Sequence, residues 1–179
     1  MDALLIIDMS NDFVDDKGGL SVKGPAQAIV PAIIKSANET LEGGGIVVVC
    51  MDEHLNGKDH SWPNHNEPGT WGAQLYSPLK TWWENIAIIK FPSQVYYIPK
   101  QSYNAFHDTE LGRTLRDLDI KTVKLTGVCT DICVFNTGCG AFDESLEIIV
   151  PRSCVATFSQ FGETALQMMA LQFNAKIVD

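Results

Sequence analysis

The sequence predicts an α/β domain of three layers, in which helices cover both faces of a central, mostly parallel sheet of about six strands. Short runs of apolar, β-branched residues recur along the 179-residue chain, and segments with apolar residues at helical spacing separate them. The runs are continuously apolar, which is typical of strands buried on both faces of a parallel sheet. The regular alternation of strand and helix indicates right-handed crossovers between neighbouring parallel strands.

The expected strands are short and bounded by polar or glycine-rich segments; they cover residues 4–7, 46–50, 86–89, 122–125, 146–150 and 175–178. The first expected helix, residues 25–41, opens with a proline and stops at the glycines of residues 43–45, which is a common start and stop for a helix. Two further helices are expected over residues 109–118 and 161–173, and another is expected to begin within residues 131–142. We expect one domain over residues 1–179, because this length supports a single core and the sequence has no repeat or linker.

Composition narrows the classes of partner. The formal net charge of -9 argues against nucleic acid or an anionic membrane surface as the main partner. The longest apolar run, residues 46–51, is far shorter than the roughly 18 residues of a membrane-spanning helix. The N-terminus shows no export signal, and five cysteines are an odd set for a disulfide framework. We therefore expect a cytoplasmic protein whose special cysteines are reactive or bind metal.

Reactive side chains follow the expected strands, where ligands bind in sheets of this kind. Asp8 follows the first strand, and Asp52 and His54 follow the second. Lys100 and Cys133 follow the next two, so an acid, a histidine cluster, a lysine and a cysteine are expected on one rim. A Rossmann-like dinucleotide site is excluded, because no G-x-G-x-x-G follows any expected strand.

Each of these residues has an ordinary alternative role. Cys133 at a helix start would favour the thiolate, because the helix dipole and unpaired N–H groups stabilise it, but a free cysteine is also commonly a small buried hydrophobe. Asp8 is either a turn-capping carboxylate or a base that faces the site. Lys100 is either catalytic or an ordinary solvated lysine. Their joint placement on one edge favours the catalytic interpretation.

Three of the four histidines lie close together in the sequence, at positions 54, 60 and 65, just after Asp52. Imidazoles with a carboxylate suit a divalent metal such as zinc, iron or manganese. The alternative is a surface loop that happens to contain histidines.

Three blocks together resemble one family across essentially the whole chain. They are LLIIDMSNDF at residues 4–13, PK at 99–100 and TGVCTDICV at 126–134, and they resemble the isochorismatase-like cysteine hydrolases in order and spacing. This resemblance implies that Asp8 accepts the thiol proton, Lys100 polarises the pair and Cys133 attacks the substrate. It also implies a cis peptide between Val128 and Cys129, and an oxyanion hole formed by the backbone N–H groups of Cys129 and Cys133.

A further stretch is similar to the metal loop of the nicotinamidase branch: DEH at 52–54, His60, WPNH at 62–65 and GTWGA at 69–73. The resemblance implies one divalent metal ion held by Asp52, His54 and His65, with His60 as a less certain fourth ligand. The metal would orient the pyridine ring of nicotinamide, and hydrolysis through a cysteine thioester would give nicotinate and ammonia for NAD salvage. The ring contacts expected are Phe13, Leu20, Trp62 and Tyr103, and relatives commonly form homo-oligomers.

One residue departs from the branch. Many nicotinamidases have cysteine after W-P-x-H, whereas this chain has Asn66, which is not one of the implied ligands.

Two alternative functions remain beside nicotinamide hydrolysis. One is a metal-independent cysteine hydrolase of the same superfamily that acts on another small amide or a vinyl ether. The other is a non-enzymatic binding module, but that would require the loss of Asp8, Lys100 or Cys133, and all three are present.

Overall fold

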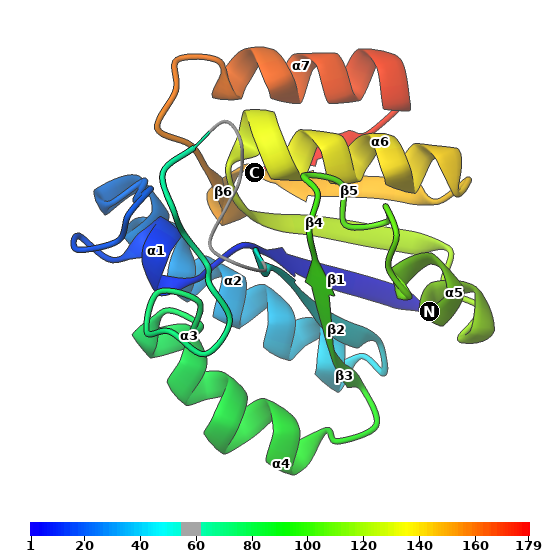
Figure 1. Cartoon of the computed structure of the whole chain (residues 1–179). Coiled ribbons are helices and arrows are strands. Elements are labelled where there is room, and N and C mark those ends of the chain that lie inside the picture. Colours follow the sequence, from blue (N-terminus) through cyan, green and yellow to red (C-terminus); the bar gives the residue numbers. More distant parts are fainter. Residues whose placement is uncertain (55–61) are drawn as a thin grey trace.

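The computed structural model of the chain describes residues 1–54 and 62–179. A twisted sheet lies between two layers of helices, and this arrangement confirms the predicted three-layer α/β fold (Figure 1). No helix among the described residues is both long enough and apolar enough to cross a membrane.

The described part of the chain contains a seven-stranded sheet in which every pair of neighbouring strands is parallel. The strand order is β3-β2-β1-β4-β5-β7, and the short β6 pairs with the end of β4. The strands are β1 (Asp2–Ile7), β2 (Ile46–Asp52), β3 (Val95–Lys100), β4 (Thr122–Val128), β5 (Glu147–Pro151), β6 (Val155–Ala156) and β7 (Lys176–Val178).

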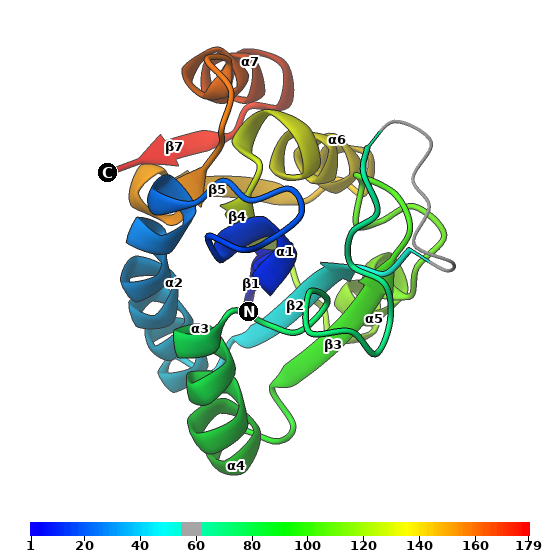
Figure 2. The same ribbon diagram turned by 60° about the vertical axis from the view of Figure 1, so that its left-hand side comes forward.

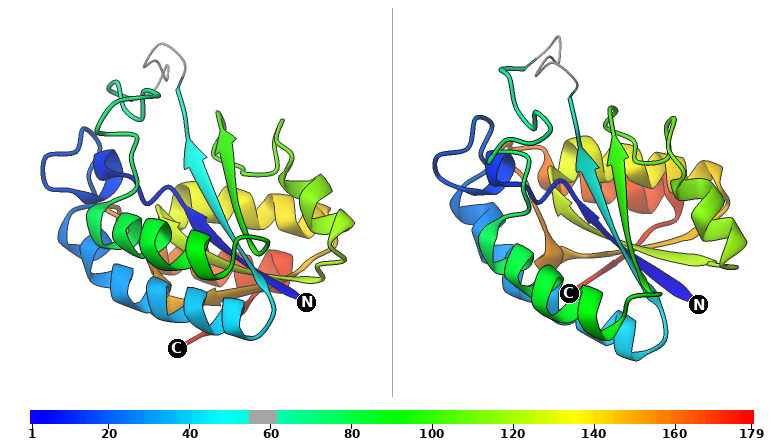
Figure 3. Two further views of the ribbon diagram at one scale, coloured as in Figure 1. Left: turned by 90° about the horizontal axis from the view of Figure 1, so that it is seen from below. Right: turned by 60° about the horizontal axis from the view of Figure 1, so that its bottom comes forward.

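Two helical layers cover the sheet (Figures 2 and 3). The helices are α1 (Asn11–Val14), α2 (Gly24–Glu42), α3 (Ser77–Trp82), α4 (Ile88–Lys90), α5 (Leu111–Asp117), α6 (Phe135–Asp143) and α7 (Gly162–Phe173), with π-helical turns η2 (Trp83–Ala87) and η3 (Thr130–Val134) and a 3-10 turn η4 (Arg152–Cys154). Helices α2, α3 and α4 pack on one face, and α5, α6 and α7 pack on the other.

The central strand β1 shows why the two cores exist. Its Leu4 and Ile6 point into the core beneath α2, while Leu5 and Ile7 point into the core beneath α5, α6 and α7. Because successive side chains of a strand point to opposite faces, a strand between two helical layers must be apolar at every position. This explains the unbroken run of hydrophobic residues before Asp8.

One predicted strand is wrong. Residues 86–89 are helical, and they continue the helix that starts with α3 through η2 into α4. Only Ala87 of this run is buried, whereas Ile89 is 67% exposed, so the apolar run does not belong to the sheet core. The true third strand is β3, which contains Pro99. Proline cannot donate to a sheet ladder, but β3 is an edge strand, where proline is tolerated.

The other predicted elements are confirmed with small shifts at their ends, and β6 was not predicted. The register aligns the carboxyl ends of the four strands that matter for function. Ile7 pairs with Cys50 on one side and Gly127 on the other, and Asp52 pairs with Lys100. The residues after these strands therefore meet at one edge of the sheet.

Candidate active site

Asp8 lies at this edge because β1 ends immediately before it. Its φ of 55° is in the left-handed region, which bulky residues avoid and which aspartate tolerates. Its backbone N–H donates to the carbonyl of Cys50 at 2.9 Å, so β2 holds the turn in place. Gly127 opposite has a φ of 111°, and a Cβ there would lie 2.0 Å from the Ile7 carbonyl oxygen. Only glycine lets β1 and β4 approach this closely beside the site.

Lys100 is the central cation of the site. Its Nζ lies 2.8 Å from Oδ2 of Asp8 and forms a second ion pair with Oδ1 of Asp52. All three side chains are buried. The end of β2 also holds the Asp8 carboxylate directly, because the Asp52 backbone N–H donates to Oδ1 of Asp8 at 2.8 Å. One buried ammonium therefore holds two carboxylates, and the surface-lysine alternative is wrong.

Cys133 lies beside this network on the π-helical turn η3, which follows the loop after β4. A carboxylate oxygen of Asp8, one of Asp52 and Sγ of Cys133 all lie within 4.8 Å of one another. The peptide bond between Val128 and Cys129 is cis, so the bond implied by the resemblance is confirmed. The carbonyl of Cys129 accepts hydrogen bonds from Ile132 at 3.0 Å and Val134 at 3.1 Å, which fixes the turn that carries Cys133.

Burial dominates the protonation of these groups. It raises the pKa of Asp8 to about 6, with the Asp52 carboxylate adding to the rise and Lys100 opposing it. It also raises the pKa of Cys133 well above its ordinary value, although Lys100 opposes that shift. Desolvation of Cys133 therefore works against the thiolate that a helix start would favour. Burial alone would lower the pKa of Lys100, but Asp8, Cys133 and Asp52 outweigh it, so the pKa is raised and the ammonium stays charged.

A second cluster lies at the same edge of the sheet and shares Asp52 with the first; it consists of Asp52, His54 and His65. One donor atom from each lies within 4.8 Å of the others, and all three residues are buried. Oδ2 of Asp52 is 3.4 Å from Nε2 of His54, and the His54 and His65 rings lie with centroids 4.6 Å apart. Two ligands at about 2.1 Å from a tetrahedral ion lie roughly 3.4 Å apart, so this spacing fits a divalent metal.

The orientation of His65 also fits a ligand. Its Nδ1 lies 2.7 Å from the carbonyl oxygen of Pro63. When Nδ1–H donates to that oxygen, Nε2 keeps its lone pair, which is the arrangement usual in metal-binding histidines. Phe13 packs against the same ring with a centroid distance of 5.3 Å. His60, the fourth ligand suggested by the sequence, lies outside the described residues.

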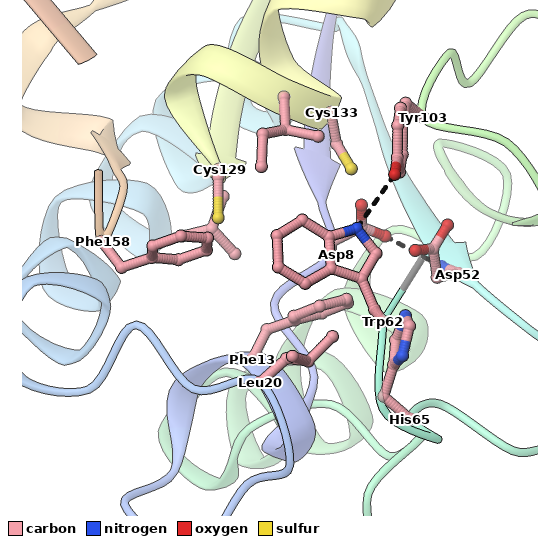
Figure 4. A pocket seen from close by; sticks show the side chains of 12 residues that line it. Asp8, Phe13, Leu20, Asp52, Trp62, His65, Tyr103, Cys129, Cys133 and Phe158 are labelled. Carbon is pink, nitrogen blue, oxygen red and sulfur yellow. Dashed lines mark hydrogen bonds between the residues drawn. The ribbon is translucent and has the colours of Figure 1, made fainter. Parts of the chain in front are cut away.

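Both clusters open into a single pocket (Figure 4). All four residues expected to contact the ring line it, together with residues of both clusters; the lining is Asp8, Phe13, Leu20, Asp52, Trp62, His65, Tyr103, Val128, Cys129, Ile132, Cys133 and Phe158. The Trp62 indole N–H donates to the Tyr103 hydroxyl at 3.0 Å across the pocket. Its lining is largely apolar with a few converging polar groups, as in sites that bind small ring-shaped ligands.

Three lining residues were missed from the sequence. Val128 and Ile132 belong to the block that contains Cys133, so their position in that block could have indicated them. Phe158 had no such signal, because it follows β6, a two-residue strand. It lies edge-on to Trp62 with a centroid distance of 6.1 Å. Asp131 fixes its turn, accepting hydrogen bonds from Thr157 at 2.6 Å and Ser159 at 2.5 Å.

Comparison with known proteins agrees with this geometry. A family model described as the isochorismatase domain matches residues 2–179. The uncharacterized isochorismatase family protein PncA of Bacillus subtilis (strain 168) is 35% identical, and the alignment covers 99% of this chain and 98% of the relative. The crystal structure of pyrazinamidase/nicotinamidase from Streptococcus mutans UA159 is 35% identical with a TM-score of 0.92, covering 99% of this chain and 100% of that one. The pyrazinamidase of Pyrococcus horikoshii in complex with zinc is 26% identical with a TM-score of 0.84, covering 99% and 98%. The chain therefore belongs to the isochorismatase family, and it is a hydrolase of that family.

Proposed function

We propose that this enzyme is a nicotinamidase, which hydrolyses nicotinamide to nicotinate and ammonia through a thioester on Cys133. One observation carries the proposal: Asp8 and Cys133 line the same pocket as Asp52 and His65. The proposed nucleophile, its proposed base and two of the proposed metal ligands thus line one pocket. The similarity to pyrazinamidase/nicotinamidase from Streptococcus mutans supports the same substrate class.

The chemistry of acylation follows from the arrangement around Asp8. Sγ of Cys133 attacks the carboxamide carbon, and its proton passes to the Asp8 carboxylate as the C–S bond forms. The backbone N–H groups of Cys129 and Cys133 stabilise the negative charge that develops on the carbonyl oxygen. Asp8 then gives the proton to the leaving nitrogen, the C–N bond breaks, and ammonia departs. Lys100 remains charged throughout and keeps the Asp8 carboxylate oriented towards Cys133.

Deacylation reverses these roles. A water molecule attacks the thioester carbon while Asp8 accepts one of its protons. The C–S bond breaks, nicotinate forms, and the proton held by Asp8 returns to the sulfur of Cys133. One carboxylate that accepts and returns a proton suffices for both halves of the reaction.

Asp52, His54 and His65 would hold the divalent ion, with His60 as a proposed fourth ligand. When bound, the ion supplies a Lewis-acidic position for the pyridine nitrogen, directly or through water. Phe13, Leu20, Trp62 and Tyr103 would contact the ring and fix its plane, so that the carboxamide carbon lies within reach of Cys133.

The test is release of ammonia and nicotinate from nicotinamide by the full-length protein, with metal content measured on the same sample. We expect turnover and about one divalent ion per chain, with activity lost after chelation and restored by zinc, iron or manganese. A clean, metal-loaded protein without activity on nicotinamide would overturn the substrate. Activity that survives chelation on another small amide would favour the metal-independent alternative.

A further inference from the structure

Asn66 is a buried polar residue that the proposed chemistry does not use. It directly follows His65, and its side chain is fully buried. Its φ of 46° is in the left-handed region, where asparagine is one of the few residues with a side chain that is found regularly. A buried asparagine in this conformation, next to a proposed metal ligand, calls for a structural reason.

Its hydrogen bonds join three separate segments. The Asn66 carbonyl accepts from the backbone N–H of His54 at 3.2 Å, and its own N–H donates to Oδ2 of Asp12 at 2.8 Å. Its side-chain Oδ1 accepts from the hydroxyl of Ser10 at 2.7 Å. The first bond reaches the proposed ligand that follows β2. The other two reach Ser10, which lies between β1 and α1, and Asp12, which lies in α1.

These bonds fix the separation between the two imidazoles. His65 is joined to Asn66 covalently, and His54 is joined to it through the 3.2 Å backbone bond. The bond to His54 runs from backbone to backbone, so the Asn66 side chain would act by holding its own backbone in place through Ser10. The Ser10 bond then anchors the pair to β1, since Ser10 lies two residues after Asp8.

We propose that Asn66 is a positioning residue that sets the spacing of His54 and His65 for a divalent ion. The inference rests on the proposed metal site and deepens it. Partners outside the ligand set that orient ligands commonly change metal affinity by about tenfold to a hundredfold when they are removed.

The test uses Asn66→Gly, because glycine accepts the left-handed conformation and the change deletes only the side-chain bond. Zinc affinity is measured on the chelator-stripped full chain by competition with a metal indicator. We expect the Kd for zinc to rise roughly tenfold. Ser10→Ala, which removes the donor of the same bond, should give a similar rise. Ser10→Ala also removes the 3.4 Å bond that this hydroxyl accepts from the Phe13 N–H, so the double variant should weaken zinc binding little beyond Ser10→Ala.

Asn174→Gly is the matched control. Asn174 ends α7 with a φ of 53°, and it is exposed and away from the site. Its replacement should leave zinc affinity unchanged. A purely structural role for Asn66 would lower the unfolding midpoint of the metal-free protein and leave the Kd at the wild-type value, which would overturn the proposal. A wild-type chain that binds no zinc would instead overturn the metal site of the proposed function, and this inference with it.

Discussion

Lys100 shows how one residue serves both stability and the site. A buried ammonium is unfavourable unless it is paired, and here two buried carboxylates, Asp8 and Asp52, pair with it. Burial would raise the pKa of Asp52, but Lys100 and His54 together outweigh it, so the pKa is lowered. Its Oδ1 faces Lys100 while its Oδ2 faces His54, so Asp52 couples the proposed catalytic group to the proposed metal ligands.

Lys100→Met should therefore leave two carboxylates buried without a cation. We expect the free energy of unfolding to fall by about 3–5 kcal/mol, together with loss of activity on nicotinamide. Urea denaturation followed by circular dichroism measures the first effect. Lys176→Met is the control, because Lys176 and its partner Glu147 are exposed and their 3.3 Å ion pair is screened by water. Equal losses of unfolding free energy in the two variants would show that the buried ion pairs of Lys100 stabilise the fold no more than the exposed pair of Lys176 does.

At the scale of elements, Asp131 holds the turn after β6 that carries Phe158, one of the residues that line the pocket. Two hydroxyls that flank Phe158 donate to this one carboxylate. Asp131→Ala should release the turn and raise KM for nicotinamide by roughly tenfold, with a smaller change in kcat, because a hydrogen bond to a charged group contributes about 1.5–3 kcal/mol.

Steady-state kinetics test this prediction with two companion variants. Thr157→Val removes one of the two donors and should give an intermediate KM. Glu163→Ala removes an exposed carboxylate that pairs with Arg152 on the surface, and it should leave KM unchanged. A KM that rises equally in Glu163→Ala would contradict a local role for Asp131.

The elements also show what a sequence can and cannot predict. Strands such as β1 and β2 were predictable because burial on both faces forces an unbroken apolar run. The helical run at residues 86–89 has the same composition, and only its exposure distinguishes it. β3 was obscured by Pro99, whose tolerance depends on the edge position that emerges only from the sheet order.

The same limit applies to the site. The strand order explains why Asp8, Asp52, Lys100 and the turn with Cys133 converge, and alternation of strands and helices was enough to expect this. The ion pair between Lys100 and Asp52 depends on the register of β2 and β3, which the sequence does not reveal. Burial raises the pKa of Cys133, and a local pattern cannot report burial in tertiary structure.

At the scale of the whole molecule, a metal that binds only the folded chain must stabilise it. Free zinc at about 100 times its Kd should add about 2.7 kcal/mol to the free energy of unfolding. Thermal unfolding of the chelator-stripped protein with and without zinc measures this shift. His65→Ala should abolish it, whereas His107→Ala should not, because His107 is exposed and lies outside the cluster. An undiminished shift in His65→Ala would mean that zinc binds elsewhere.

His65 is a cleaner probe of the metal than Asp52. Asp52→Ala would remove a ligand and also one of the two partners of Lys100, so its effect on stability would mix two causes.

Homo-oligomer formation stays a prediction from the resemblance to the family.

Cys133 is the proposed nucleophile, and a second thiol in the same pocket, that of Cys129, allows a direct comparison. Cys129 and Cys133 both line the pocket, but only Cys133 has its sulfur beside the carboxylates of Asp8 and Asp52. The measurement is ammonia release from nicotinamide by metal-loaded Cys133→Ala and Cys129→Ala. We expect Cys133→Ala to lose activity by roughly 10⁴-fold or more, and Cys129→Ala to keep it within about tenfold, because Cys129 is proposed to act only through its backbone. Ammonia release by Cys133→Ala at a rate near that of the wild type would contradict the mechanism.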